Sequence, residues 1–132
     1  MIMLFSGRFD RPHLGHIVTI KKLMQRYDEV IVVMLEYVGQ HYPTKDRCQI
    51  LRDGLRYVPG NFNLIVNKEH FAFITRKELS RLPEFDIYGS GNEDCLVHIA
   101  ALGHDTEYVE RYGEFSASHE WKYQKIERIV CD

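Results

Sequence analysis

The sequence predicts an α/β fold in which a parallel sheet of five strands is packed against helices. Short apolar runs alternate with amphipathic stretches along the chain, as in consecutive strand–helix–strand units. The chain has 132 residues, of which 45% are hydrophobic and 27% charged, values that are ordinary for one globular domain. No internal repeat, low-complexity tract or linker-like stretch is found, so we expect a single domain over residues 1–132.

The first half of the chain contains the clearest strand and helix signals. Residues 2–5 form a continuous apolar run, typical of a buried parallel strand. Residues 15–26 place apolar side chains at helical spacing, with basic residues on the opposite side, and predict an amphipathic helix. Residues 29–35 (EVIVVML) are rich in β-branched side chains and predict a second strand. Residues 44–57 predict a second helix with Thr44 as its N-cap.

The second half continues the alternation. The remaining predicted elements are a strand over residues 62–66, a helix over 70–82, a strand over 85–88, a helix over 93–102, a strand over 106–111 and a final helix from Ser116 onward. In open parallel sheets, ligands bind beyond the carboxyl ends of the strands. We therefore expect a ligand site at the turns after the first and fourth strands and in the segment after the fifth.

The turn after the first predicted strand (SGRFDRPHLGH, residues 6–16) carries the residues that predict a phosphate site. Gly7 lets the backbone approach a ligand closely, and Gly15 removes a side chain that would block it. His13 and His16 lie where a helix begins, and helix N-termini favour phosphate through their unpaired N–H groups and partial positive charge. The alternative for a single histidine in this place is a helix cap or a surface residue, but the complete set favours a nucleotide site.

Three further residues of the same turn belong to this set. Arg8 is placed to reach a phosphate, and Phe9 follows it in the ordered pattern. Asp10 is acidic in a loop that otherwise suits phosphate, so its expected role is to hold Mg²⁺ or to orient a neighbouring group.

Residues 7–16 (GRFDRPHLGH) lie between a predicted strand and a predicted helix. They resemble the H-x-G-H signature of the nucleotidyltransferase superfamily, which is usually written G-x-F-D-x-x-H-x-G-H. The segment is similar to glycerol-3-phosphate cytidylyltransferase and its relatives, and the archaeal nicotinamide-mononucleotide adenylyltransferases share its Gly-Arg-Phe opening. The resemblance implies a Rossmann-like three-layer sandwich in which nucleotide phosphates rest on His13 and His16. It also implies Mg²⁺ and the transfer of a nucleoside monophosphate from CTP or ATP to a phosphate monoester, with release of pyrophosphate.

Two later segments extend the resemblance. Residues 43–51 (PTKDRCQIL) resemble the family stretch in which an arginine opens the second helix; Arg47 then either assists the phosphates or the acceptor, or is an exposed first-turn residue. Residues 111–118 (RYGEFSAS) resemble the family segment R-T-E-G-I-S-T-T, whose arginine and hydroxyl groups are implied to hold the leaving pyrophosphate. The matching positions are Arg111, Ser116 and, more loosely, Ser118.

The chain also departs from the family pattern. GSGN at residues 89–92 stands where relatives carry an acidic turn, and Gly89 and Asn92 are its candidate nucleotide-binding positions. The lysines that cytidylyltransferases place before the second helix are missing, except for Lys45. Two alternatives therefore stay open: an enzyme similar to nicotinamide-mononucleotide adenylyltransferases, and a degenerate nucleotide-binding module without catalysis. The aromatic stretch at residues 70–73 (HFAF) favours core or interface packing over an acceptor pocket.

Composition and charge exclude several other classes of protein. The formal net charge of -2 supplies no basic field for nucleic acid or an anionic membrane. No apolar run approaches the roughly 18 residues of a membrane span. The cysteines are odd in number and lack metal-ligand spacing, so we expect reduced thiols in a cytoplasmic protein and no metal-ligating side chains. A homodimer is a further hypothesis, based on the many aromatic residues.

Overall fold

The computed structural model describes residues 1–110 of the chain; Arg111, Ser116, Ser118 and the predicted final helix lie outside the described residues. A five-stranded parallel sheet with the order β3-β2-β1-β4-β5 forms its centre, as predicted. In chain order the elements are β1 (Ile2–Gly7), α1 (Leu14–Arg26), β2 (Glu29–Leu35), α2 (Thr44–Leu55), β3 (Phe62–Asn67), α3 (Arg76–Ser80), β4 (Ile87–Ser90), α4 (Glu93–Ala101) and β5 (Asp105–Tyr108).

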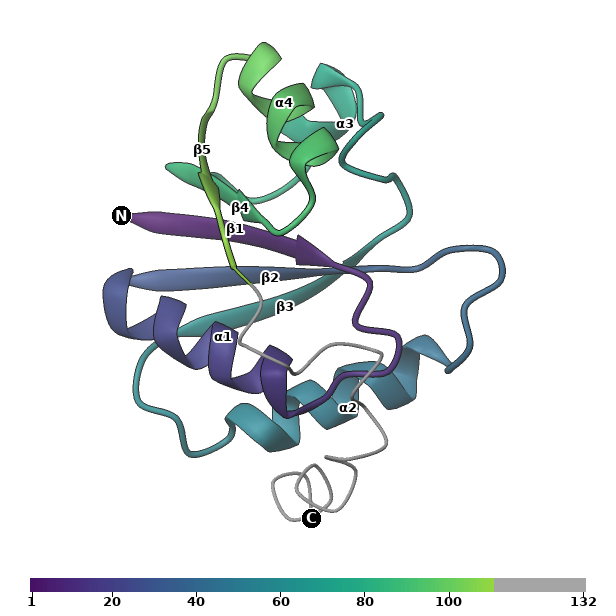
Figure 1. Cartoon of the computed structure of the whole chain (residues 1–132), viewed down its shortest axis with the longest axis vertical. Helices are drawn as coiled ribbons and strands as arrows, with labels where there is room; N and C mark the ends of the chain where they lie inside the picture. Colours follow the sequence, from purple (N-terminus) through teal and green to yellow (C-terminus); the bar gives the residue numbers. More distant parts are fainter. Residues whose placement is uncertain (111–132) are drawn as a thin grey trace.

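Helices pack on both faces of the sheet and make three layers (Figure 1). Along β1, Met3 and Phe5 belong to the apolar cluster under α1 and α2, whereas Leu4 belongs to the cluster under α3 and α4. β2 alternates in the same way. Because successive side chains of a strand point to opposite faces, a strand covered on both faces must be apolar throughout. The fold class predicted from the sequence, a Rossmann-like three-layer sandwich, is confirmed.

The strand order places the turn after β1 beside the turn after β4. The chain moves outward from β1 through β2 to β3, and then returns across the sheet to β4 on the other side of β1. The connections that follow β1 and β4 therefore run to opposite faces of the sheet. A crevice at the carboxyl ends of these two neighbouring strands follows from that topology.

The prediction of a helix over residues 70–82 is wrong in extent. The structure has only the short helix α3, Arg76–Ser80, in this segment. Thr75 is its N-cap: the hydroxyl accepts the N–H of Glu78 at 3.1 Å, and the Glu78 carboxylate accepts the N–H of Thr75 at 2.9 Å. This capping box fixes the start of the helix. Before it, the N–H of Ala72 donates to the His70 ring at 3.0 Å and forms a separate turn.

The fourth strand continues beyond the predicted residues 85–88. Gly89 pairs with Phe5 of β1, and Ser90 pairs with Tyr108 of β5, so both residues belong to the sheet and not to a turn. Pairing with a neighbour on each side holds the strand extended through the small residues that signalled its end. β5 is in turn shorter than predicted.

The predicted N-cap of the second helix is also wrong. Pro43 occupies that position, and Thr44 is the first helical residue. The Thr44 hydroxyl donates to the Glu36 carboxylate at 2.6 Å, so it ties α2 to the segment after β2.

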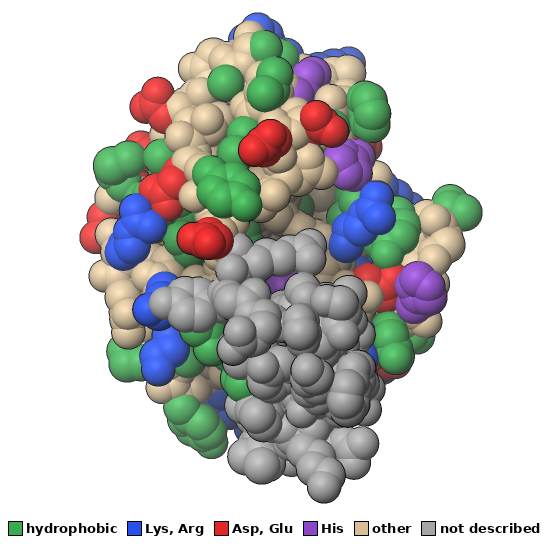
Figure 2. All heavy atoms as spheres, in the orientation of Figure 1, with side chains coloured by type: hydrophobic (Ala, Val, Ile, Leu, Met, Phe, Trp, Pro, Cys, Tyr) green, Lys and Arg blue, Asp and Glu red, His purple; other side chains and the backbone are tan. Residues whose placement is uncertain are grey.

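The distribution of charged side chains on the surface agrees with the small net charge of the chain. Acidic and basic side chains are mixed over the face shown in Figure 2, with no broad basic area among its described residues. No helix within residues 1–110 combines the length and apolarity needed to cross a membrane. Cys48 and Cys95 are buried free thiols.

Candidate functional site

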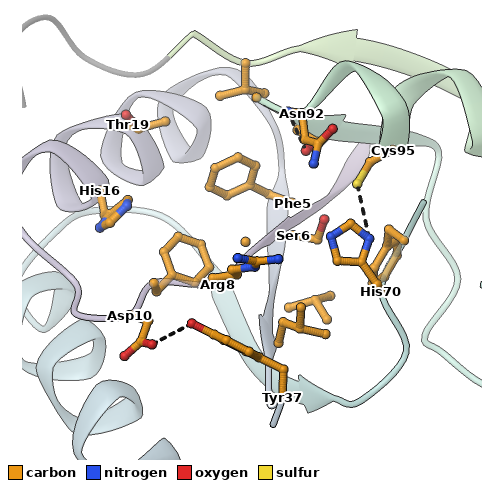
Figure 3. A pocket seen from close by; sticks show the side chains of 18 of the residues that line it. Phe5, Ser6, Arg8, Asp10, His16, Thr19, Tyr37, His70, Asn92 and Cys95 are labelled. Atoms are coloured by element: carbon orange, nitrogen blue, oxygen red, sulfur yellow. Dashed lines mark hydrogen bonds between the residues drawn. The ribbon is translucent and has the colours of Figure 1, made fainter. Parts of the chain in front are cut away.

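A cavity of about 590 Å³ opens at the carboxyl ends of β1 and β4. Ligand pockets in proteins commonly fall in this range of volume, roughly 300–1,000 Å³. Its walls come from the β1–α1 turn, the segments after β2 and β3, and the β4–α4 turn (Figure 3). The predicted site residues that line it are Gly7, Arg8, Phe9, Asp10, His13, His16 and Asn92.

His13 and His16 lie together at the start of α1. His13 is the N-cap, and its Nδ1 accepts the N–H of Gly15 at 3.1 Å; the Nδ1 of His16 accepts the N–H of His13 at 3.1 Å. The rings are stacked, with centroids 3.8 Å apart. Because each Nδ1 accepts a backbone N–H, the proton of each neutral ring lies on Nε2. Both rings line the cavity beside the positive end of the helix dipole.

The helix-cap alternative and the phosphate hypothesis are compatible for His13. The side chain caps α1 through one nitrogen, and the same side chain lines the cavity. Capping fixes the orientation of the ring, so the second nitrogen is positioned by the fold without a ligand.

Gly7 and Phe9 support this arrangement. A Cβ at Gly7 would lie 2.8 Å from the ring of Phe9, so the glycine is required by the aromatic side chain rather than by a ligand alone. Phe9 has φ 47°, in the left-handed region that non-glycine residues rarely adopt. Its ring is 4% exposed and meets His16 edge to face at 5.1 Å, so its packing holds the histidine ring.

Asp10 connects the β1–α1 turn by hydrogen bonds to the segment that follows β2. Its Oδ2 accepts the Tyr37 hydroxyl at 2.5 Å and the N–H of His41 at 2.7 Å, and its Oδ1 accepts the N–H of Tyr42 at 3.0 Å. The side chain is 4% exposed. Burial raises the pKa of the Asp10 carboxyl, but these hydrogen bonds, led by that from Tyr37, outweigh it and lower the pKa to about 2.

The contacts of Asp10 bear on the two roles expected for it. Both carboxylate oxygens accept hydrogen bonds from the segment after β2. Orientation of a neighbouring segment is the role that the contacts support.

Replacing Asp10 by asparagine is expected to lower the free energy of unfolding at neutral pH by about 2 kcal/mol, since charge-assisted hydrogen bonds are lost. The lowered pKa means that the carboxylate stabilises the fold fully above pH 4, and that this contribution is lost as the pH falls towards 2. Denaturant titrations at several pH values measure both effects. The exposed Asp105→Asn variant is the control. Equal stability of Asp10→Asn and the wild type at pH 7 would contradict this role.

Arg47 is buried, which corrects the exposed first-turn interpretation. Its side chain is 0% exposed. Its guanidinium donates to the backbone carbonyl oxygens of Arg8, Leu35 and Tyr42 and to the side-chain oxygens of Gln40 and Thr44. Arg47 does not line the cavity, so its predicted contact with phosphates or acceptor is not made directly in this structure. It positions the backbone of Arg8 instead.

Two predicted glycines also lie outside the cavity lining. Gly15 is buried in the first turn of α1, where its carbonyl accepts the Thr19 hydroxyl at 2.8 Å. Gly89 lies within β4, and a Cβ there would come within 2.8 Å of the Met3 sulfur. The absence of a side chain at Gly89 therefore makes room for core packing.

Asn92 is the N-cap of α4 and lines the cavity. Its Oδ1 accepts the N–H of Asp94 at 2.9 Å, which leaves the amide Nδ2 as the group suited to donate to a ligand. The other predicted phosphate contacts, Arg111, Ser116 and Ser118, lie outside the described residues.

The sequence does not predict a large part of the cavity lining. The lining residues that were not proposed as site residues include Ser6, Tyr37, His70, Phe71, Ser90 and Cys95. The Ser6 hydroxyl is hydrogen-bonded to the buried Tyr88 hydroxyl, and burial raises the pKa of Tyr88 and so keeps it neutral. The signal for this part of the lining is the HFAF stretch, for which the sequence predicts packing. Phe71 does pack, yet the same segment lines the cavity.

The described residues do not form a metal centre. No group of three or more histidine, cysteine or acidic side chains within residues 1–110 is arranged to hold a metal ion. Asp10 is the only carboxylate among the described lining residues, and its two oxygens accept hydrogen bonds from Tyr37 and Tyr42. The described residues therefore supply no all-protein cage for Mg²⁺, which at nucleotide sites is held largely by phosphate oxygens and water.

The fold and the site together define an α/β protein with a phosphate-type turn after β1. The model of the family described as cytidylyltransferase-like matches residues 4–79, more than half of the chain. The chain therefore belongs to the cytidylyltransferase-like family, which confirms the superfamily recognised from the H-x-G-H turn.

Curated relatives are named nicotinamide-nucleotide adenylyltransferase. The protein of Pyrobaculum arsenaticum is 32% identical over 112 residues, which cover 77% of this chain and 63% of the relative. That of Caldivirga maquilingensis is 32% identical over 99 residues, which cover 67% of this chain and 56% of the relative. The chain thus spans less than two thirds of the length of these relatives.

A solved structure has the same fold. It is a bifunctional NMN adenylyltransferase/ADP ribose pyrophosphatase from Francisella tularensis, complexed with AMP and a manganese ion. The TM-score is 0.67 with 18% sequence identity, over 94% of this chain and 41% of that one. At this identity the likeness concerns the fold alone.

Proposed function

We propose that the protein is a nucleotidyltransferase that moves a nucleoside monophosphate from a triphosphate to a phosphate monoester and releases pyrophosphate. The observation that carries the proposal is the His13–His16 pair, whose stacked rings are held by backbone hydrogen bonds and line a cavity at the start of α1. A helix N-terminus and two imidazoles suit the oxygens of a triphosphate. Membership of the cytidylyltransferase-like family agrees with this chemistry.

The proposed reaction is a direct displacement at the α-phosphorus. An oxygen of the acceptor phosphate forms a bond to that phosphorus, and the bond to the bridging oxygen of the leaving pyrophosphate breaks. A phosphate dianion is already nucleophilic, so no general base and no covalent intermediate with the protein are required. The protein contributes positioning and neutralisation of charge.

Among the described lining residues, we assign this chemistry to His13, His16 and Arg8. His13 and His16 bind phosphate oxygens near the reacting centre, where charge develops in the transition state. Arg8 lies in the same cavity with its guanidinium 4.9 Å from the centre of the Tyr37 ring. We propose that Mg²⁺ enters bound to the triphosphate rather than through a carboxylate of this cavity.

ATP and nicotinamide mononucleotide are the substrates that we propose within the broader choice of CTP or ATP and a phosphate monoester. The names of the relatives support this pair, which the sequence interpretation held as an alternative. The aromatic wall that contains Phe71 also suits an acceptor with a ring. A cytoplasmic location, a homodimer and the absence of nucleic-acid partners stay predictions of the sequence.

The experiment that tests this proposal measures pyrophosphate release from ATP and CTP with a panel of phosphate monoesters. We expect turnover to be fastest with ATP and nicotinamide mononucleotide. Nucleotide binding without turnover on any acceptor would instead support a degenerate binding module. The altered GSGN turn favours that second candidate, because its Asn92 takes the place of an acid and is used partly as a helix cap.

A further inference from the structure

The wall of the cavity that is formed by the β3–α3 connection and α4 has a fixed structure. Phe71 is 3% exposed and stacks in parallel on Tyr88, with ring centroids 5.2 Å apart. His70 precedes it, and the sulfur of Cys95 lies 4.0 Å from the His70 Nδ1. In Figure 3, His70 stands between Cys95 and Ser6, with the ring edge opposite to Cys95 turned towards the cavity.

The contacts of the His70 ring fix its tautomer. Its Nδ1 accepts the N–H of Ala72 at 3.0 Å, so in the neutral ring the proton lies on Nε2. The same contact holds the ring orientation, because a rotated ring would leave the backbone N–H of Ala72 without its acceptor. His70 thus presents a pre-oriented Nε2–H donor on the cavity side.

Charge in the surroundings keeps this ring neutral. Burial lowers the pKa of His70, the positive charge of Arg8 lowers it further, and Asp94 acts in the opposite direction. A neutral N–H donor pairs well with a carbonyl or hydroxyl oxygen, whereas an ionised phosphate is better matched by the helix terminus at His13 and His16. The wall at His13 and His16 therefore suits the anionic groups of a ligand, and the wall at His70 suits its neutral polar groups.

We propose that His70 is a specificity-determining residue, whose Nε2–H donates a hydrogen bond to a carbonyl or hydroxyl oxygen on the part of the acceptor remote from its phosphate. This inference rests on the proposed transferase function. It assigns the β3–α3 wall to the acceptor and leaves the β1–α1 turn to the phosphates. The first residue of the HFAF stretch then has a role that its aromatic neighbours do not share.

The test compares steady-state constants of the full chain for ATP and for nicotinamide mononucleotide. In His70→Leu, which keeps volume but has no donor, the KM for nicotinamide mononucleotide is expected to rise about tenfold, as for one lost hydrogen bond. The KM for ATP is expected to stay the same. In His70→Gln, whose amide can still donate, most of the loss should be recovered. His104→Leu is the matched control, since His104 packs on Phe85 outside this cavity.

The possible outcomes distinguish failure of the role proposed for His70 from failure of the proposed transferase function. An unchanged acceptor KM in His70→Leu, or an equal rise in both KM values, would overturn the role of His70 while the transferase function stood. Absence of turnover in the wild type with every acceptor would instead remove the proposed function itself. If His70→Leu did not fold, His70→Met would take its place, because it also fills the site without an N–H donor; melting temperatures establish which variants are folded.

Discussion

Replacement of His13 by asparagine together with His16 by alanine is expected to lower kcat/KM for pyrophosphate release by at least about a thousandfold. Removal of one preorganised donor to developing charge typically costs roughly a hundred- to a thousandfold in rate. Asparagine is chosen at position 13 because His13 caps α1, and asparagine is among the best N-cap residues. The double variant therefore removes both Nε2–H donors while the helix start is preserved.

The measurement combines a pyrophosphate assay with calorimetric titration of ATP. Loss of activity and of ATP affinity in a variant that is still folded at the assay temperature is the expected result. His104→Leu again serves as the control for removal of a histidine away from the cavity. Pyrophosphate release at the wild-type rate in the double variant would show that the phosphates are bound elsewhere.

The parts of the fold that sequence predicts well are those in which local pattern and tertiary burial agree. β2 coincides with the predicted residues 29–35, because a strand covered on both faces must be apolar throughout. The helix predicted over residues 70–82 fails for the opposite reason. Apolar residues such as Phe71 and Ile74 mimic helical spacing, but the Thr75 cap and the turn at His70 decide the local structure.

The same distinction applies to the site. The β1–α1 turn could be predicted because its residues are contiguous and form an ordered pattern. The rest of the lining includes His70 from the β3–α3 connection and Cys95 from α4, which are far apart in the sequence and meet only in the folded chain. No spacing within one segment signals such an assembly, so sequence reasoning interpreted the aromatic stretch as packing.

Arg47 illustrates why burial is hard to predict for a charged residue. In a helix considered alone, its place in the first turn faces solvent. Its guanidinium donates to the carbonyl oxygens of Arg8 in the β1–α1 turn, Leu35 at the end of β2 and Tyr42 before α2, which makes full burial tolerable. These long-range acceptors could not be identified from the residues around position 47.

Replacement of Arg47 by methionine is accordingly expected to lower the free energy of unfolding by about 3 kcal/mol. The buried carbonyl oxygens of Arg8, Leu35 and Tyr42 would lose the donors that satisfy them, and each unsatisfied buried group costs roughly 1–3 kcal/mol. Arg47→Lys should recover only part of this, since an ammonium group cannot reproduce the planar fork of donors. Denaturant unfolding measures the change in each variant.

Arg56→Ala provides the matched control at the other end of α2. Its side chain is 59% exposed and pairs with Asp53, so its removal is expected to change stability by no more than about 0.5 kcal/mol. The comparison also separates two roles for Arg47. If Arg47 bound phosphate directly, the Arg47→Met variant would have a normal free energy of unfolding and would bind ATP weakly. If the side chain positions the Arg8 backbone, Arg47→Met must lower both quantities, because the guanidinium holds the carbonyl oxygens of Arg8 and Tyr42 and the N–H of Tyr42 donates to Asp10.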